Sequence, residues 1–139
     1  MKKLHTIILL DDDEVTNTIN ESVILSLNVC ENLLTFPNAI QGLSYFNRIQ
    51  SIDDIPELVL VDLKMPIIDG FEFKKAFEHS FSILKNKVKM IVVTSSDRLE
   101  DREIAVQLGF DDYYVKPLTH QKFQDLIIKH FPDALTKSA

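Results

Sequence analysis

Residues 58–70 have the sequence LVLVDLKMPIIDG, in which a short apolar run ends on an acid. A continuous run of Leu and Val is typical of a parallel strand buried on both faces, so the pattern predicts a strand over 58–62. Asp69 and Gly70 favour a turn, and Asp69 is a typical residue to cap a following helix. The stretch therefore predicts a buried strand, an acid at its carboxyl end and the start of a helix.

The same alternation of apolar runs and amphipathic stretches extends over the whole chain. Strands are predicted at 4–10, 33–36, 58–62, 88–94 and 112–115. Between and after them, apolar residues recur at helical spacing, in the sets Val15, Ile19, Val23, Leu27; Ala39, Leu43, Phe46; Phe73, Ala76, Phe77, Phe81; Ile104, Ala105, Leu108; and Phe123, Leu126, Ile127, Phe131. Residues suited to helix ends accompany these sets, namely Asn38, Asp69, Asp97 and Thr119 as N-caps and Gly109 as a C-terminal residue. Five strand–helix repeats predict an α/β fold, a doubly wound parallel sheet with helices on both faces.

Composition narrows the class of protein. The chain has 139 residues, enough for one domain with a substantial core, and its net charge of −6 without a block of Lys or Arg argues against nucleic acid as a partner. Its apolar runs are too short to cross a bilayer, so no membrane association is expected. Cys30 is the single cysteine, which excludes an intramolecular disulfide and favours a reducing, cytoplasmic location. The four histidines are scattered, so a His/Cys zinc site is not expected.

Reactive side chains follow four of the five predicted strands. The first strand ends at the acidic run 11–13, the third at Asp62, the fourth at Thr94 and the fifth at Lys116. Ligands of such folds bind beyond the carboxyl ends of the strands. Carboxylates gathered there without a cation would repel one another, whereas Mg²⁺ prefers oxygen ligands and uses one or two protein carboxylates. With the hydroxyl and the ammonium group added, this edge of the sheet suits phosphoryl chemistry and a phospho-aspartate product.

These residues together resemble one family. The stretch 58–70 is similar to the phosphoacceptor segment of response-regulator receiver domains, and "LLDDD", "VVTSS" and "DDYYVKP" resemble the family's other motifs in the same order. The resemblance covers residues 4 to 131. It implies a flavodoxin-like fold with strand order 2-1-3-4-5, two helices on one face and three on the other.

The resemblance also implies roles for individual residues. Asp62 is similar to the phosphorylated nucleophile, and Asp11, Asp12, Asp62 and the backbone carbonyl of Lys64 resemble the Mg²⁺ ligands. Thr94 and Lys116 are similar to the phosphoryl-binding pair, and Tyr113 resembles the aromatic switch residue. A structural role, including a cis peptide before Pro117, is implied for Pro66, Asp69, Gly70 and Pro117.

Several alternatives remain open from the sequence. The acidic pair could be Asp12 with Asp13, although Asp13 and Glu14 favour the first turn of a helix. "ILLDDDEV" also resembles the first motif of haloacid-dehalogenase-type phosphatases, in which Asp11 would be the nucleophile and Asp13 the general acid. That interpretation leaves Asp62 unexplained. A third possibility is a receiver-shaped interaction module that never accepts phosphate.

The receiver interpretation carries expectations about partners. It implies a phosphoacceptor rather than an enzyme, supplied by a histidine kinase or phosphotransfer protein and acting on a downstream protein target. The expected domain spans 1–131, followed by a short tail at 132–139 and no output domain. The surface expected to respond to phosphorylation lies between Arg98 and His130.

Overall fold

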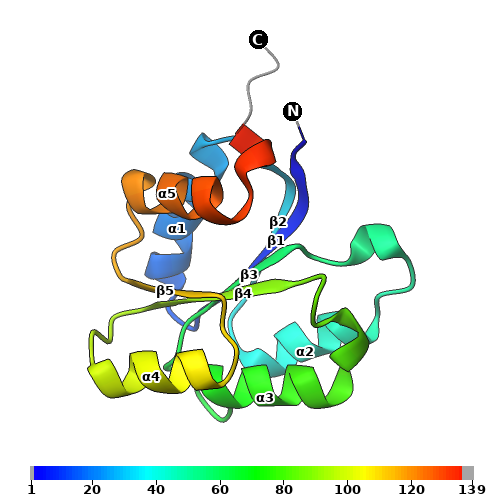
Figure 1. Cartoon of the computed structure of the whole chain (residues 1–139), viewed down its shortest axis with the longest axis vertical. Helices are drawn as coiled ribbons and strands as arrows, with labels where there is room; N and C mark the ends of the chain where they lie inside the picture. The colour runs from blue at the N-terminus through cyan, green and yellow to red at the C-terminus, as the bar shows by residue number, and fades with distance from the viewer. Residues whose placement is uncertain (1, 136–139) are drawn as a thin grey trace.

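The computed structural model describes residues 2–135. Its centre is a five-stranded sheet in which every neighbouring pair of strands is parallel, in the order β2-β1-β3-β4-β5 (Figure 1). The strands are β1 (Leu4–Leu10), β2 (Cys30–Phe36), β3 (Leu58–Val61), β4 (Lys89–Thr94) and β5 (Asp112–Val115). The predicted fold and strand order are confirmed. Strand β2 begins earlier than predicted because, at the edge of the sheet, its polar Glu31 and Asn32 face solvent.

Five α-helices cover the two faces of the sheet. They are α1 (Glu14–Ser26), α2 (Ala39–Asn47), α3 (Gly70–Ser80), α4 (Leu99–Gln107) and α5 (His120–His130). Helices α1 and α5 lie on one face and α2, α3 and α4 on the other (Figure 1). Each face has its own apolar core, because successive side chains of the strands point to opposite sides. Short 3₁₀ helices occur at Ile52–Asp54, Ser82–Leu84 and Pro132–Leu135.

The phenylalanines of α3 belong to the core, as predicted. Phe73 and Phe77 are fully buried, and the ring of Phe77 packs edge-on against Phe46 of α2 with centroids 4.9 Å apart. Each such ring contributes about 1.5–3 kcal/mol through burial alone. This packing fixes α3, the helix that follows β3 and the Asp62 loop in the chain.

The helix ends show how the sequence sets the boundaries. Asn38, Asp69 and Thr119 cap their helices as predicted, and Gly109 takes a φ of +87° just after α4. The prediction for Asp97 is wrong. The N-cap position of α4 is Arg98, and the Ser96 hydroxyl accepts from the Arg98 N–H instead.

Helix α1 presents a different face from the predicted one. Val15 and Ile19 are 67% and 53% exposed, whereas Asn17 and Asn20 are buried together with Val23. The amino-terminal half of α1 therefore turns asparagines toward the sheet. The physical reason is that polar backbone at the end of β1 lies beneath this part of the helix and needs hydrogen-bond partners, one of which is Asn17.

The end of the described chain also packs against the domain. Ala134 is 2% exposed, and the Asp133 carbonyl accepts from the backbone N–H of Lys2. The packed structure thus extends past Phe131 to Leu135, and residues 136–139 lie outside the described residues. Within residues 2–135, none of the helices combines the length and apolarity that a membrane span requires.

Candidate functional site

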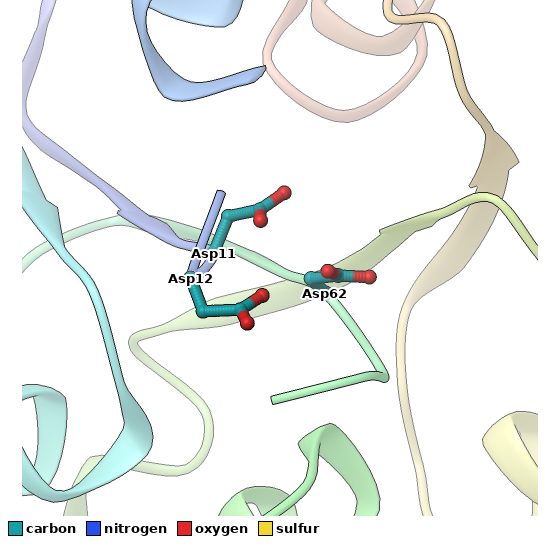
Figure 2. Close-up of side chains that lie close together, drawn as sticks. All are labelled: Asp11, Asp12 and Asp62. Carbon is teal, nitrogen blue, oxygen red and sulfur yellow. The ribbon is translucent and has the colours of Figure 1, made fainter. Parts of the chain in front are cut away.

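Three aspartates gather at the carboxyl end of the sheet (Figure 2). Asp11 and Asp12 follow β1 and Asp62 follows β3, and each offers a carboxylate oxygen within 4.8 Å of the others. The backbone N–H of Asp62 bonds to the Leu10 carbonyl at 2.9 Å, so the ladder between β1 and β3 fixes where Asp62 stands. Asp11 and Asp62 are buried and Asp12 is exposed, so the cluster opens to solvent on the Asp12 side.

Asp13 lies outside this cluster. Its carboxylate accepts hydrogen bonds from the Val15 N–H and the Thr16 hydroxyl, which caps α1. The geometry therefore pairs Asp11 with Asp12 rather than Asp12 with Asp13. It also argues against the phosphatase interpretation, because the acid that would serve as proton donor is engaged by the helix it caps.

Lys116 joins the two buried acids. Its Nζ lies 2.6 Å from Asp11 Oδ2 and 3.3 Å from Asp62 Oδ2, and the Lys116–Pro117 peptide is cis as predicted. Burial and the neighbouring charge of Asp11 raise the pKa of Asp62, although Lys116 partly opposes them. Burial lowers the pKa of Lys116, but the hydrogen bond to Asp11 and the charge of Asp62 outweigh burial and raise it.

The donor set of this cluster fits a hard divalent cation. It consists of carboxylate oxygens close enough to share one ion, and it contains neither thiol nor imidazole. A cation bound there offsets the repulsion that raises the pKa of Asp62. The residues present therefore suit Mg²⁺ and do not suit a zinc centre.

Thr94 and Tyr113 are linked through Ser96. Thr94, fully buried at the end of β4, accepts a hydrogen bond at Oγ1 from the Ser96 N–H at 3.4 Å. The Tyr113 hydroxyl donates to the Ser96 carbonyl at 2.8 Å, and the Arg102 guanidinium stands 4.6 Å from the centre of the tyrosine ring. Ser96 therefore connects the two residues for which the sequence implies a joint role.

The loop between β3 and α3 holds the acid from the other side. Asp69 and Glu72 form a capping box at the start of α3. Gly70 has little room, because a Cβ there would lie 2.5 Å from the Asp62 carbonyl. Gly70 is thus required by the close approach of two backbones. The chain turns at Ile67, which has a φ of +70°. A hydrogen bond from the Ile68 N–H to the Pro66 carbonyl closes the turn around it.

Two residues of the site were not predicted from the sequence. Asn17 donates to the Asp11 carbonyl at 2.8 Å, and Ser96 makes the contacts described above. Assigning Val15 and Ile19 to the inner face of the first helix hid Asn17. A prediction that accepted asparagine on the buried face of a helix, where the helix packs over the end of a strand, would have identified Asn17.

The family model described as response regulator receiver domain matches residues 7–128, and the chain belongs to this family. It is accordingly a signalling phosphoacceptor of two-component systems, whose phosphoryl group comes from a histidine kinase or phosphotransferase, and its acidic pocket is formed by Asp11, Asp12 and Asp62.

Individual relatives agree with this assignment. The chain is 27% identical to sporulation initiation phosphotransferase F of Bacillus subtilis over 90 residues, 62% of this chain and 69% of that protein. It is 29% identical to the sensor histidine kinase CheAY of Helicobacter pylori over 113 residues, 81% of this chain but 13% of that kinase. A two-component response regulator from Cytophaga hutchinsonii superposes with a TM-score of 0.84 at 26% identity, covering 92% of this chain and 97% of that one. The receiver domain of a Pseudomonas aeruginosa sensor histidine kinase has the same fold, with a TM-score of 0.73 at 24% identity over 90% of this chain and 95% of that one, and its structure contains a magnesium ion in the active-site cleft.

Proposed function

We propose that Asp62 is the phosphoacceptor of this receiver, and that Asp11, Asp12, Asp62 and the Lys64 backbone carbonyl hold the Mg²⁺ ion. The observation that carries the proposal is the position of Asp62, which is 6% exposed and shares one edge of the sheet with two further acids and Lys116. When bound, Mg²⁺ neutralises negative charge on the carboxylates and on the phosphoryl oxygens.

The residues of the chain then have distinct tasks. A carboxylate oxygen of Asp62 attacks the phosphorus of a phosphohistidine, so that an O–P bond forms as the N–P bond to the imidazole breaks. Lys116 exchanges one of its carboxylate contacts for a phosphoryl oxygen, and the Thr94 hydroxyl donates to another. Asp12, at the exposed side of the cluster, lies at the entrance by which the donor arrives.

Phosphorylation would reach the surface through Ser96. Once the Thr94 hydroxyl turns to the phosphoryl group, the Ser96 N–H loses its acceptor, and the backbone that also holds the Tyr113 hydroxyl is free to move. The balance between two arrangements of α4 and β5 then shifts. The responding surface lies between Arg98 and His130, and a downstream protein target binds there.

Exposed apolar side chains near the site favour a protein donor. Val15 lies just after the acidic run and is 67% exposed, and Ile67 lies in the loop after Asp62 and is 85% exposed. A histidine side chain can reach Asp62 only if the protein that carries it covers this region. The buried centre of a protein–protein contact is typically more apolar than its rim, so exposed apolar residues beside the site suit such a contact.

A labelling experiment tests the proposal. The protein is incubated with Mg²⁺ and acetyl phosphate, and the added phosphoryl group is measured together with its lability to hydroxylamine. Asp62→Asn is expected to abolish labelling, whereas Asp13→Asn, which alters a neighbouring acid outside the cluster, is expected to retain it. Label lost in Asp11→Asn but retained in Asp62→Asn would support the phosphatase chemistry instead. If the wild-type protein accepts phosphate neither from acetyl phosphate nor from a cognate kinase, the interaction module that never accepts phosphate would be supported.

A further inference from the structure

Asn17 is a buried amide directly behind the acidic pair. Its side chain lies on the inner face of α1, 8% exposed, and Nδ2 donates to the Asp11 carbonyl at 2.8 Å. Because a carbonyl oxygen can only accept, the nitrogen side of the amide must face it. The other end of the amide, Oδ1, is buried and has no hydrogen-bond partner among residues 2–135.

The carbonyl that Asn17 holds belongs to the peptide that joins the two acids. A peptide unit is planar and includes the Cα atoms of both of its residues. A hydrogen bond to the Asp11 carbonyl therefore restrains rotation of the whole Asp11–Asp12 unit, and with it the directions in which the two side chains leave the backbone. On the far side of Asp11, its Oδ1 accepts from the Asp13 N–H at 2.9 Å. The acidic pair is thus held from both sides.

Packing alone does not account for Asn17. An unpaired buried amide oxygen lowers stability, and a leucine of similar volume would avoid that cost at this position. Asn20 provides the comparison, because it lies one turn later on the same face of α1 and is 4% exposed. Within the described chain, the hydrogen bond to the Asp11 carbonyl comes from Asn17 and not from Asn20.

We propose that Asn17 is a positioning residue for the metal site, which orients the Asp11–Asp12 peptide so that both carboxylates are set for Mg²⁺ before the ion arrives. The inference rests on the proposed function of the acidic cluster. Residues that orient metal ligands typically contribute 10–100-fold to affinity. Asn17→Leu is therefore expected to raise the dissociation constant for Mg²⁺ about tenfold.

Calorimetric titration with Mg²⁺ tests this, with Asn20→Leu as the matched control. Both variants place a leucine on the buried face of α1, but only Asn17→Leu removes the donor to Asp11. Weaker binding in Asn17→Leu with unchanged binding in Asn20→Leu supports the proposal. Equal affinity in Asn17→Leu and wild type, or an equal loss in both variants, overturns it. Asn17→Ala carries the same test if leucine prevents folding.

A second measurement separates positioning from general damage. In labelling with acetyl phosphate, Asn17→Leu should need more Mg²⁺ for half-maximal rate and should reach the wild-type rate at saturating Mg²⁺. The Asp12 amide, which is part of the restrained peptide, should shift in the nitrogen–proton NMR spectrum of Asn17→Leu and not of Asn20→Leu. A wild-type protein that does not bind Mg²⁺ would refute the proposed function itself, whereas normal wild-type binding with an unaffected Asn17→Leu refutes only this inference.

Discussion

Lys116→Met removes the cation between two buried acids while keeping a side chain of similar length. The lost contacts are 2.6 Å to Asp11 and 3.3 Å to Asp62. At an effective dielectric constant of about 20, unit charges at the longer distance attract by roughly 5 kcal/mol. Relief of the buried lysine's own desolvation offsets part of this, and breaking a buried pair typically costs about 3–5 kcal/mol. We expect Lys116→Met to lower the free energy of unfolding by about 3 kcal/mol in metal-free buffer near neutral pH.

The deficit should depend on pH and on Mg²⁺. The folded-state pKa of Asp62 already lies above its ordinary value, and loss of Lys116 raises it further. An acid with a raised folded pKa lowers stability as pH rises through that pKa, so the deficit should be largest near neutrality and shrink on acidification. Mg²⁺ supplies the missing positive charge, so it should stabilise Lys116→Met more than it stabilises the wild type.

Urea unfolding followed by circular dichroism, with and without Mg²⁺, measures these effects. Lys74→Met is the matched control, since Lys74 is a buried lysine whose ion pair is with Glu78, away from the acidic cluster. Its stability deficit should not respond to Mg²⁺. A Lys116→Met deficit below about 1 kcal/mol, or equal stabilisation of both lysine variants by Mg²⁺, would refute this role of Lys116.

Three further predictions concern separate parts of the molecule. Ile67 holds a positive φ while 85% exposed, so Ile67→Gly should raise the free energy of unfolding by about 1 kcal/mol in urea titrations; a lower value would show that its turn is unstrained. Phe77→Ala should lower the same quantity by about 3–5 kcal/mol, because the ring is fully buried and packs from α3 against Phe46 of α2. A loss as small as that of an alanine substitution at an exposed position would contradict this packing. Burial raises the pKa of Asp112, but hydrogen bonds from His130, the Tyr113 backbone and Lys129 outweigh burial and lower it overall. A lowered folded pKa stabilises the protein above the ordinary pKa and loses that contribution as pH falls through the folded value. Asp112→Asn should therefore destabilise the protein near neutral pH and not near pH 3, as thermal melts at the two pH values would show, and a deficit independent of pH would argue against the ion pair.

Much of the fold could be predicted because the signals were local and repeated. Buried parallel strands leave continuous apolar runs, as in β3, where the run Leu58–Val61 is buried along its whole length. Strand β2 was predicted too short. It includes the polar residues Glu31 and Asn32 because it lies at the edge of the sheet, and residue composition does not reveal that position. The face of α1 was wrong at Val15 and Ile19, because spacing alone cannot show that the end of a strand needs amide donors.

The acidic cluster could be predicted as a set, because the topology brings the carboxyl ends of neighbouring strands together. The distances between these side chains, the register of the acidic run and the residues that connect the parts of the site could not be predicted. The pairing of Asp11 with Asp12 depends on Asp13 being turned into the cap of α1. Ser96 acts through its backbone N–H and carbonyl, which every residue type has, so its identity gave no signal.

Gly70 has a consequence for how sequences of this kind can vary. A side chain at this position would clash with the backbone of Asp62 and Leu63, so glycine is required there. Ile67, three residues earlier in the same loop, faces solvent, so the size of its side chain is not limited by packing. Within a single short loop, one position is fixed by the close approach of two backbones, whereas another exposes its side chain to solvent.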